Sequence, residues 1–373
     1  MEWIELGKLI EFQKKSKIKA GDGKTEGKYL MYTSSMLVDK YLDEYQYSEE
    51  ALIMGTGGNA SIHYSSGKFG TSTDCYVIYN KGAKALLKYI YYYLLGNIYI
   101  LEEGFRGAGL KHTNQKYIKN IKIPILSVEA QEKIVKVLDQ AQALIDKRKE
   151  QIEALDQLIE SIFYTMFGDP VRNEKGWEVK EVQHLGKVGS SRRVYLSECV
   201  NEGIPFYRGQ EVSRLSYGKK PNNELFISPD HYEELKAQRG IPKKGDLLLP
   251  SICPDGDIWM VDTNEPFYFK DGRVLWVELE DENINNFFIK STLAHILRRN
   301  FRGISSGSTF SELKIFLLEK ITIPIPPLAL QNDFAQKVET IEKQKKLLEE
   351  SLELMEENYK SIMDKAFKGQ LFN

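Results

Sequence analysis

Cysteine and histidine are scarce in this 373-residue sequence, and neither forms a metal-binding pattern. The three cysteines, Cys75, Cys199 and Cys253, are far apart and form no Cys-x-x-Cys pair. None of the five histidines has another histidine four residues away. Structural zinc sites require clustered ligands of these types. We therefore expect reduced thiols and no metal site.

Long hydrophobic runs are also absent. The longest, from Tyr89 to Leu101, contains a Gly-Asn pair and is too short to cross a bilayer. Glu2, Glu5 and Glu11 interrupt the beginning of the chain, where a signal peptide would be apolar. We expect a soluble cytoplasmic protein with no membrane contact.

Motifs that would support catalysis by this chain are missing. No Asn-Pro-Pro-Tyr type motif for amino methylation occurs. The sequence Gly55-Thr56-Gly57-Gly58 is glycine-rich like a cofactor loop, but it lacks the following helix and acidic residue, so it indicates a turn at the end of a strand. The carboxylates of Asp230 and Glu234 are too close in sequence to Lys236 for a nuclease metal site. We expect no enzymatic activity and no bound cofactor.

What the sequence does contain is a long internal repeat. The segment from Ile121 to Phe167 returns from Ile321 to Phe367 at a constant offset of 200 residues without a gap. Each copy begins with Ile-x-Ile-Pro, and proline biases its neighbour to extended geometry. The repeat therefore predicts a strand, a proline turn and a long helix in each half of the chain.

Apolar residues recur at alternating steps of four and three along both copies, which is a heptad stripe. Such a stripe is narrower than the apolar face of an ordinary core helix, so it predicts a two-helix seam. Stripes like this also occur in homodimers and stalks, but two copies in one chain favour an internal antiparallel pair. The predicted seam contains Ile145, Ile152, Leu155 and Ile159 in the first copy and Leu348, Leu352, Met355 and Tyr359 in the second.

The segments before the two repeats are expected to be globular domains that share a fold. The corresponding apolar strands are Ala51–Gly55 and 246–250, followed by 75–79 and 274–278. A helical stretch and a glycine-rich loop then precede each repeat, which indicates an α+β domain. The predicted organisation is a first domain (1–120), a first long helix (121–168), a second domain (169–320) and a second long helix (321–373).

The chain resembles the specificity subunit of type I restriction and modification systems. The resemblance rests on Ile-x-Ile-Pro followed by a helix beginning near Gln131 and Gln331, and on the Gly-Ser loops before each repeat. It also rests on the helix ends, Met-Phe-Gly-Asp-Pro at 166–170 and Ala-Phe-Lys-Gly-Gln-Leu at 366–371. The twofold occurrence of these motifs in the same order extends the resemblance over the whole chain.

The resemblance implies a non-catalytic DNA reader with two target recognition domains, each reading half of a split site. The two long helices would pack as an antiparallel coiled coil in a pseudo-twofold cyclic arrangement. They would dock two methyltransferase subunits, which use S-adenosylmethionine, and restriction subunits, which use ATP and Mg²⁺, would join them. A pseudo-twofold protein matches a DNA duplex because the two strands are themselves related by a twofold axis.

The two domains differ in length, although the helices keep their spacing. Trp3 lies 118 positions before Ile121, whereas Trp177 lies 144 positions before Ile321. Domains that have diverged on a repeated frame are expected to read different bases. We therefore predict an asymmetric bipartite target with a non-specific gap, and half-sites about one duplex turn (~34 Å) apart.

The overall charge argues mildly against a DNA reader, since 51 Lys and Arg against 53 Asp and Glu give a net charge of −2. Basic residues are concentrated locally, however, near the beginning of each domain. Arginine reads guanine and glutamine reads adenine through paired hydrogen bonds, although a phosphate contact or a plain surface role is the alternative for any one residue. The candidates are Lys17, Tyr32, Ser34, Ser35, Arg106, Lys111 and His112 in the first domain, and Arg192, Arg193, Arg208, Gln210, Arg214, Lys219, Lys220, Ser306 and Ser308 in the second.

A second reading of the sequence is a scaffold unrelated to DNA, with two interaction domains on a coiled-coil spacer. Salt-sensitive DNA binding would distinguish the two, because phosphate contacts release counterions and weaken as salt rises.

Overall fold

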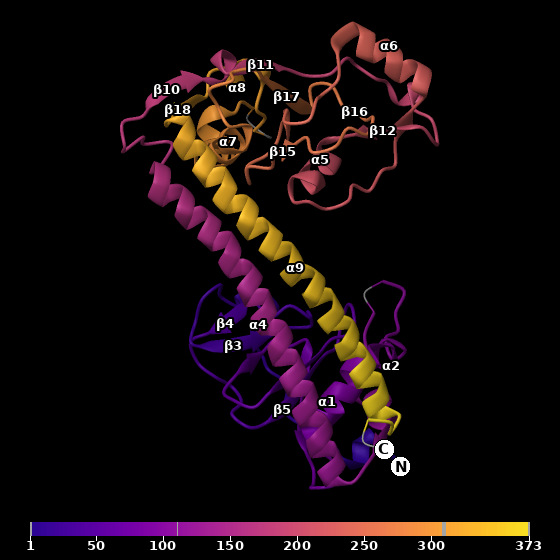
Figure 1. Ribbon diagram of the computed structural model, residues 1–373. Helices are drawn as coiled ribbons and strands as arrows, with labels where there is room; N and C mark the ends of the chain where they lie inside the picture. The colour runs from indigo at the N-terminus through magenta and orange to yellow at the C-terminus, as the bar shows by residue number, and fades with distance from the viewer. Residues whose placement is uncertain (1, 110, 308–310, 372–373) are drawn as a thin grey trace. The chain divides into compact units, whose positions relative to one another are not determined.

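The computed structural model describes residues 2–109, 111–307 and 311–371, which divide into two units (Figure 1). Unit 1 combines Met1–Ile152 with Leu347–Asn373, and unit 2 is Glu153–Lys346. Each unit therefore contains one globular segment together with portions of both long helices. The domain bounds given by the sequence, which place each helix in a segment of its own, stay a prediction.

The two long helices are α4 (Val128–Phe167) and α9 (Leu328–Phe367), each of 40 residues. Their bounds differ by 200 positions, as the repeat predicts. The Ser127 hydroxyl accepts a hydrogen bond from the Ala130 amide and satisfies one of the free amides in the first turn of α4. In α9 the Pro327 carbonyl accepts from the Leu330 amide. The proline-marked turn thus leads directly into the helix in both copies.

In unit 1 the helices run antiparallel. Ile134 and Leu138 of α4 share a core with Phe367 of α9, and further along α4 Lys149 pairs with Glu356 (2.8 Å). Residue numbers therefore rise along one helix as they fall along the other.

Unit 2 shows the same direction of packing. Phe163 of α4 makes an edge contact with Phe334 of α9, and nearer the middle of α4 Asp156 pairs with Lys345 (2.5 Å). Of the eight predicted seam residues Ile145 is buried, and the other seven are half-buried. Helix contact is confirmed in both units, while the coiled-coil geometry stays a prediction.

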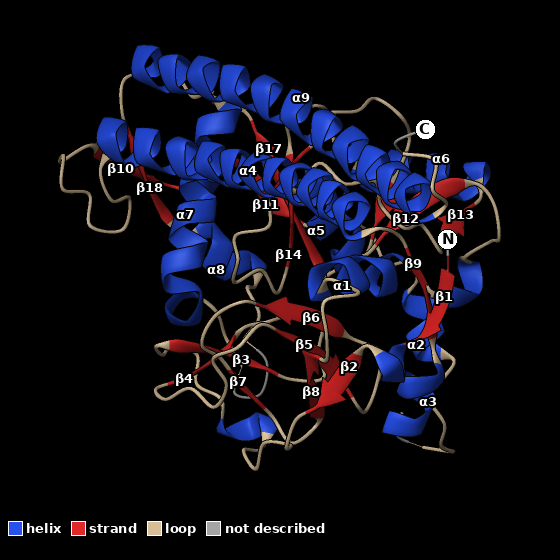
Figure 2. Ribbon diagram, turned by 90° about the horizontal axis from the view of Figure 1, so that it is seen from below, coloured by secondary structure: helices blue, strands red, loops and turns tan. Residues whose placement is uncertain are grey.

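The described residues of unit 1 form three small sheets. β1 pairs with β9, a four-stranded sheet has the order β2-β8-β5-β6, and a three-stranded sheet has the order β4-β3-β7 (Figure 2). Helix α1 (Leu87–Gly96) packs against β5 and β6, and α2 (Ile98–Glu102) and α3 (Gln115–Asn120) follow it. The strands are β1 (Glu2–Glu5), β2 (Ile10–Phe12), β3 (Tyr29–Tyr32), β4 (Lys40–Leu42), β5 (Ala51–Gly55), β6 (Ile62–Ser65), β7 (Gly70–Thr71), β8 (Cys75–Asn80) and β9 (Lys122–Ile125).

Unit 2 repeats this arrangement strand for strand. β10 pairs with β18, and the two larger sheets have the orders β11-β17-β14-β15 and β13-β12-β16. In both units the central strand of the three-stranded sheet pairs parallel with its short neighbour, β3 with β7 and β12 with β16. The strands are β10 (Glu178–Glu181), β11 (Gly186–Gly189), β12 (Ile204–Tyr207), β13 (Phe226–Ile227), β14 (Leu247–Pro250), β15 (Trp259–Met260), β16 (Tyr268–Phe269), β17 (Val274–Leu279) and β18 (Thr322–Ile325).

The greater length of the second globular segment comes mainly from two helices. α5 (Gly209–Ser216) and α6 (Pro229–Arg239) lie between β12 and β14, whereas only β4 separates β3 from β5. The longer α7 (Asn286–Ile304) and the short α8 (Ile315–Glu319) complete unit 2. Because β5 and β8 hold the same places in their sheet as β14 and β17 hold in theirs, the predicted correspondence of these strands is confirmed.

The apolar runs of β5 and β14 are explained by two cores, one on each face of the strand. In β5, Leu52 and Met54 belong to the core under α1, while Ile53 packs with Phe69 on the opposite face. Successive side chains point to opposite faces, so a strand covered on both faces is apolar throughout. In the described part of the chain no helix is long and apolar enough to span a membrane.

Candidate nucleic-acid interface

The residues predicted to contact DNA come from three segments that occupy equivalent positions in the two units. The first segment follows β2 in unit 1 and β11 in unit 2, and the second follows β3 and β12. The third is the glycine-rich loop that precedes α3 and α8. The residues predicted in the two units therefore lie at three equivalent positions of the fold, although the residue types at those positions differ.

One backbone hydrogen bond attaches the end of β3 or β12 to the turn that leads into β8 or β17. The Ser72 amide donates to the Tyr32 carbonyl (2.9 Å) in unit 1. The Lys270 amide donates to the Tyr207 carbonyl (2.8 Å) in unit 2.

A second bond attaches the same turn to the residue after β5 or β14. The Thr56 amide donates to the Asp74 carbonyl (2.8 Å), and the Ser251 amide donates to the Arg273 carbonyl (2.9 Å). Asp74 and Arg273 are therefore equivalent, and each immediately precedes its strand.

The third bond brings in the end of the glycine-rich loop. The Thr113 amide donates to the Thr56 carbonyl (3.1 Å), and the Leu313 amide donates to the Ser251 carbonyl (2.7 Å). We call these three bonds the backbone clamp. They hold segments that are far apart in sequence at one surface, and they do so without specifying the side chains.

In unit 1 the side chains gather around Thr56. Lys15 Nζ lies 3.5 Å from Thr56 Oγ1 and over the Tyr76 ring (4.5 Å to its centroid). His112 Nδ1 lies 3.1 Å from the Thr56 carbonyl oxygen, so this nitrogen carries the proton. The candidates Lys17, Arg106, Lys111 and His112 are exposed.

The second segment of unit 1 is attached to β6 through its backbone. The Ser61 hydroxyl donates to the Ser34 carbonyl (3.1 Å), and His63 Nε2 lies 2.8 Å from the Ser35 carbonyl. Burial lowers the pKa of His63, and the bond to Ser35 opposes that shift without cancelling it. A neutral His63 that donates through Nε2 therefore holds the loop in place.

Tyr32 requires a correction, because its side chain is buried. Its ring packs edge-on against Phe69 and 5.2 Å from the His63 ring, in the core on the outer face of β5. Tyr207, its counterpart in unit 2, is buried as well, against Phe267. This tyrosine therefore packs in the core beneath the surface, and its buried ring does not contact bases.

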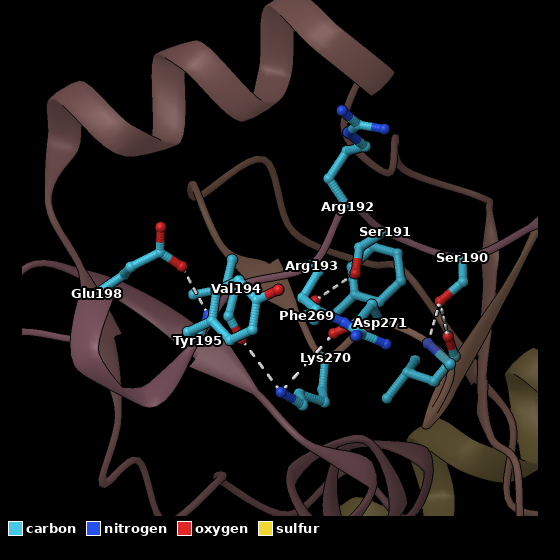
Figure 3. A network of polar contacts seen from close by, with 12 residues as sticks. Ser190, Ser191, Arg192, Arg193, Val194, Tyr195, Glu198, Phe269, Lys270 and Asp271 are labelled. Carbon is cyan, nitrogen blue, oxygen red and sulfur yellow. Dashed lines mark hydrogen bonds and ion pairs between the residues drawn. The ribbon is translucent and has the colours of Figure 1, made fainter.

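In unit 2 the first segment takes part in a polar network, shown in Figure 3. Arg193 Nε pairs with Asp271 (2.9 Å), and Lys270 Nζ donates to the Val194 carbonyl (3.1 Å). Ser190 Oγ accepts from the Gly272 amide (2.9 Å). In the same view the Arg192 guanidinium points away from this network, and its Nε lies 3.3 Å from Gln238.

A cavity of about 930 Å³ opens beside α5 in unit 2. Three predicted residues line it, namely Arg208, Gln210 and Arg214. Its wall also contains Lys270 and Arg273, which are not among the residues predicted from the sequence. Four of the five charged side chains in the lining are cationic, but Arg208 is paired with Glu211 and Glu224, and Arg273 with Glu312.

Arg208 also requires a correction, since two carboxylates already bind it. Its Nη2 lies 2.9 Å from Glu211 and 3.0 Å from Glu224. Burial would raise the pKa of Glu211, but its hydrogen bonds to Arg208 outweigh burial and lower it. Arg208 therefore stabilises the beginning of α5 and, with two carboxylate partners and a side chain only 36% exposed, presents fewer free donors than an unpaired arginine.

The remaining candidates in unit 2 lie on the surface. Arg214, Lys219 and Lys220 are exposed, and Arg214 Nε donates to the Lys220 carbonyl (3.1 Å). Ser306 is exposed and forms a backbone bridge with Glu312. Ser308 lies outside the described residues.

The missed residues Asp74, Lys270 and Arg273 all belong to the turn before β8 or β17. The strand correspondence recognised in the sequence places Asp74 before Cys75 and Arg273 before Val274, so that alignment contained the signal. What it lacked was the neighbourhood of the turn, which depends on contacts across the sheet. Among the described residues no cluster of three or more His, Cys, Asp or Glu side chains suits a metal ion.

Comparison with known proteins gives a consistent result. A family model described as the type I restriction modification DNA specificity domain matches residues 1–155 and 174–357. A putative type I restriction enzyme specificity subunit from Haemophilus influenzae is 26% identical over 313 residues, covering 81% of this chain and 77% of the relative. The type I restriction enzyme EcoDI specificity subunit of Escherichia coli is 22% identical and covers 100% of this chain and 89% of its own length.

A solved structure has the same fold. The chain superposes on the type I restriction-modification S subunit from M. genitalium with a TM-score of 0.61 and 14% identity, covering 98% of this chain and 96% of that chain.

Proposed function

The chain belongs to the type I restriction modification DNA specificity family, and we propose that it recognises an asymmetric bipartite site in double-stranded DNA, each unit reading one half-site. It is the non-catalytic specificity subunit of such a system. We further propose how the DNA site is divided between the two units and which partner subunits bind the chain.

The observation that carries the proposal is the backbone clamp. In each unit the same three hydrogen bonds join the end of β3 or β12, the turn before β8 or β17, the residue after β5 or β14 and the end of the glycine-rich loop. The side chains at these places differ between the units. A repeated scaffold with different side chains is what two readers of unlike sequences require, because base edges are distinguished by side-chain donors and acceptors.

The repeated helices support the second part of the proposal. α4 and α9 carry exposed charged residues along most of their length, which leaves surface for partner subunits. We propose that two methyltransferase subunits dock there, with S-adenosylmethionine bound in them. Restriction subunits that use ATP and Mg²⁺ would join the same assembly. Action on cellular and incoming DNA would place the complex in the cytoplasm.

The charge of the chain supports assistance from those partners. A net charge of −2 gives little long-range attraction to DNA. The chain alone is expected to bind duplex DNA weakly, and the complex with its methyltransferase partner to bind tightly. Both should lose affinity steeply as salt rises.

The testing experiment is to sequence methylated adenines in cells that express this chain with its methyltransferase partner. The expected result is a motif of two unlike half-sites separated by a gap. A continuous motif, or a palindromic one, would contradict the proposal. Exchanging residues 169–320 for the second domain of another family member should change one half of the motif and leave the other unchanged.

A further inference from the structure

The turn before β8 and β17 carries opposite charges in the two units. Asp74 precedes β8 and Arg273 precedes β17, and their carbonyls accept the same clamp bond. Because the clamp fixes the backbone, the two side chains project from equivalent points. The position therefore presents a hydrogen-bond acceptor in unit 1 and a donor in unit 2.

The neighbouring position in the glycine-rich loop differs as well. His112 and Glu312 each precede the residue that makes the third clamp bond, and each forms a backbone bridge across its loop, with Arg106 and with Ser306. In unit 2 the Arg273 guanidinium forms an ion pair with the Glu312 carboxylate, which Lys314 also contacts.

The two side chains of this ion pair differ in exposure to solvent. The Arg273 side chain is 60% exposed, whereas the Glu312 side chain is only 18% exposed. Glu312 therefore anchors one edge of the guanidinium while the rest of it remains accessible. Arginine presents five N–H donors in a rigid fork, so an arginine held on one edge can still donate from another.

The Asp74 carboxylate, unlike the Arg273 guanidinium, has no partner among the described residues. The residue is exposed, and its carboxylate makes no hydrogen bond or ion pair with any other described side chain or backbone group.

Gln210 lines the same cavity as Arg273 and is exposed. The surface around Arg273 thus holds a second group with paired donors and acceptors.

We propose that Asp74 and Arg273 are specificity-determining residues, one in each unit, and that Glu312 is a positioning residue for Arg273. This rests on the proposed function. Arg273 contacts guanine in the second half-site, since arginine pairs with its O6 and N7, and Asp74 accepts from the amino group of cytosine in the first half-site. The inversion of charge at one clamp position makes the two half-sites unlike.

The test uses the chain assembled with its methyltransferase partner. Bound duplexes are selected from a randomised pool and sequenced, for the wild type and for Arg273→Ala, Asp74→Asn and Lys187→Ala. Lys187 is the matched control, because it is an exposed cation paired with Glu280 at the far end of β17. We expect Arg273→Ala to reduce the preference for guanine at one position of one half-site about ten- to a hundredfold.

Asp74→Asn should reduce the preference for cytosine at one position of the other half-site, and Lys187→Ala should leave both half-sites unchanged. For Glu312, the Gln variant should weaken the guanine preference and the Asp variant should restore most of it. A purely structural role would instead lower affinity equally for all sequences.

The failures of the two proposals are distinguishable. If the wild-type complex selects no bipartite sequence, the proposed function is wrong. If the wild type selects one but Arg273→Ala and Asp74→Asn both keep the wild-type preferences, this inference is overturned. Loss of affinity without any change in base preference would also overturn it, because the residues would then be phosphate contacts. Arg273→Lys, which keeps the charge but not the fork, serves as a second variant if the alanine variant does not fold.

Discussion

Gln131 in α4 and Gln331 in α9 share two equivalent hydrogen bonds in the two units. The Gln131 Oε1 accepts from the Leu86 amide (2.9 Å), and the Gln331 Oε1 accepts from the Asn285 amide (2.9 Å). Each Nε2 donates to the carbonyl five residues earlier, at distances of 2.9 and 2.7 Å. Both side chains are fully buried. The repeated glutamine therefore joins the long helix to the helix of the globular segment, since Leu86 precedes α1 and Asn285 precedes α7.

Replacing either glutamine by alanine should destabilise its unit. A buried amide and a buried carbonyl would each lose a partner, which costs about 1–3 kcal/mol per group. We expect Gln131→Ala and Gln331→Ala to lower the free energy of unfolding by roughly 2–4 kcal/mol, measured by urea denaturation. Gln140→Ala on the exposed face of α4 is the control and should stay within about 0.5 kcal/mol of the wild type. Equal stability of all three variants would contradict this role.

Aspartate in the predicted seam should weaken the helix pair in unit 1. Leu352 is half-buried on α9, whereas Leu354 on the same helix is 60% exposed. A charge buried without a partner is costly, so Leu352→Asp should destabilise by about 1–3 kcal/mol in thermal or urea unfolding. Leu354→Asp introduces the same charge two residues away and should cost much less. The helix contact would be in doubt if the two variants unfolded alike.

Lys17 and Arg193 should contribute to the salt dependence of DNA binding. Lys17 precedes Ile18, whose carbonyl accepts a hydrogen bond from the Thr73 amide before β8. Arg193 precedes Val194, whose carbonyl accepts a hydrogen bond from Lys270 Nζ before β17. Removing one phosphate contact lowers the slope of log affinity against log salt by about 1. We expect this change for Lys17→Ala and for Arg193→Ala in anisotropy titrations of the assembled complex. Lys187→Ala should leave the slope unchanged; a similar change there would indicate a non-local charge effect.

His295 should make unit 2 sensitive to acid. Its ring stacks on Phe163 (4.1 Å between centroids), and burial, with smaller contributions from Arg298 and Arg299, lowers its pKa to about 4. Asp169 opposes this shift. The unfolded chain takes up a proton near pH 6.5 and the folded chain does not, so stability is lost as pH falls from 6.5 to 4.

The size of this effect is on the order of 3 kcal/mol. His295→Phe keeps an aromatic ring against Phe163 and cannot titrate, so its unfolding free energy should depend less on pH in that window. His184→Gln, at an exposed position, should retain the wild-type pH dependence. Identical pH profiles for the wild type and His295→Phe would show that His295 is not responsible.

The frame of this protein could be predicted closely. The repeat predicts a strand, a proline turn and a long helix within 121–168, and α4 runs from Val128 to Phe167. Helix periodicity and proline turns are local properties, and the repeat states them twice. The matching of β5 with β14 and of β8 with β17 was also accessible, because buried strands keep their apolar pattern when other residues change.

Individual roles at the candidate surface were harder to predict. Tyr32 and Arg208 have residue types that suit a DNA surface, but one is buried against Phe69 and the other is bound by Glu211 and Glu224. Arg273 was overlooked, although it lines the cavity beside Gln210. Phe69 lies 37 positions from Tyr32, Glu224 lies 16 positions from Arg208, and Glu312 lies 39 positions from Arg273. Exposure and pairing thus depend on how the chain folds back on itself, which a local pattern does not contain.

The sequence by itself determined that there are two α+β halves on a repeated helical frame, since apolar periodicity and proline positions act through near neighbours. Only the tertiary structure decided that the end of α9 belongs with the beginning of the chain, where Phe367 packs against Tyr89 and Tyr93. It also decided that Thr56 and Ser251 each form backbone hydrogen bonds both to the turn before β8 or β17 and to the end of the glycine-rich loop. Hydrogen bonds between distant segments are set by how the strands are ordered in the sheets, and that order exists only in the folded chain.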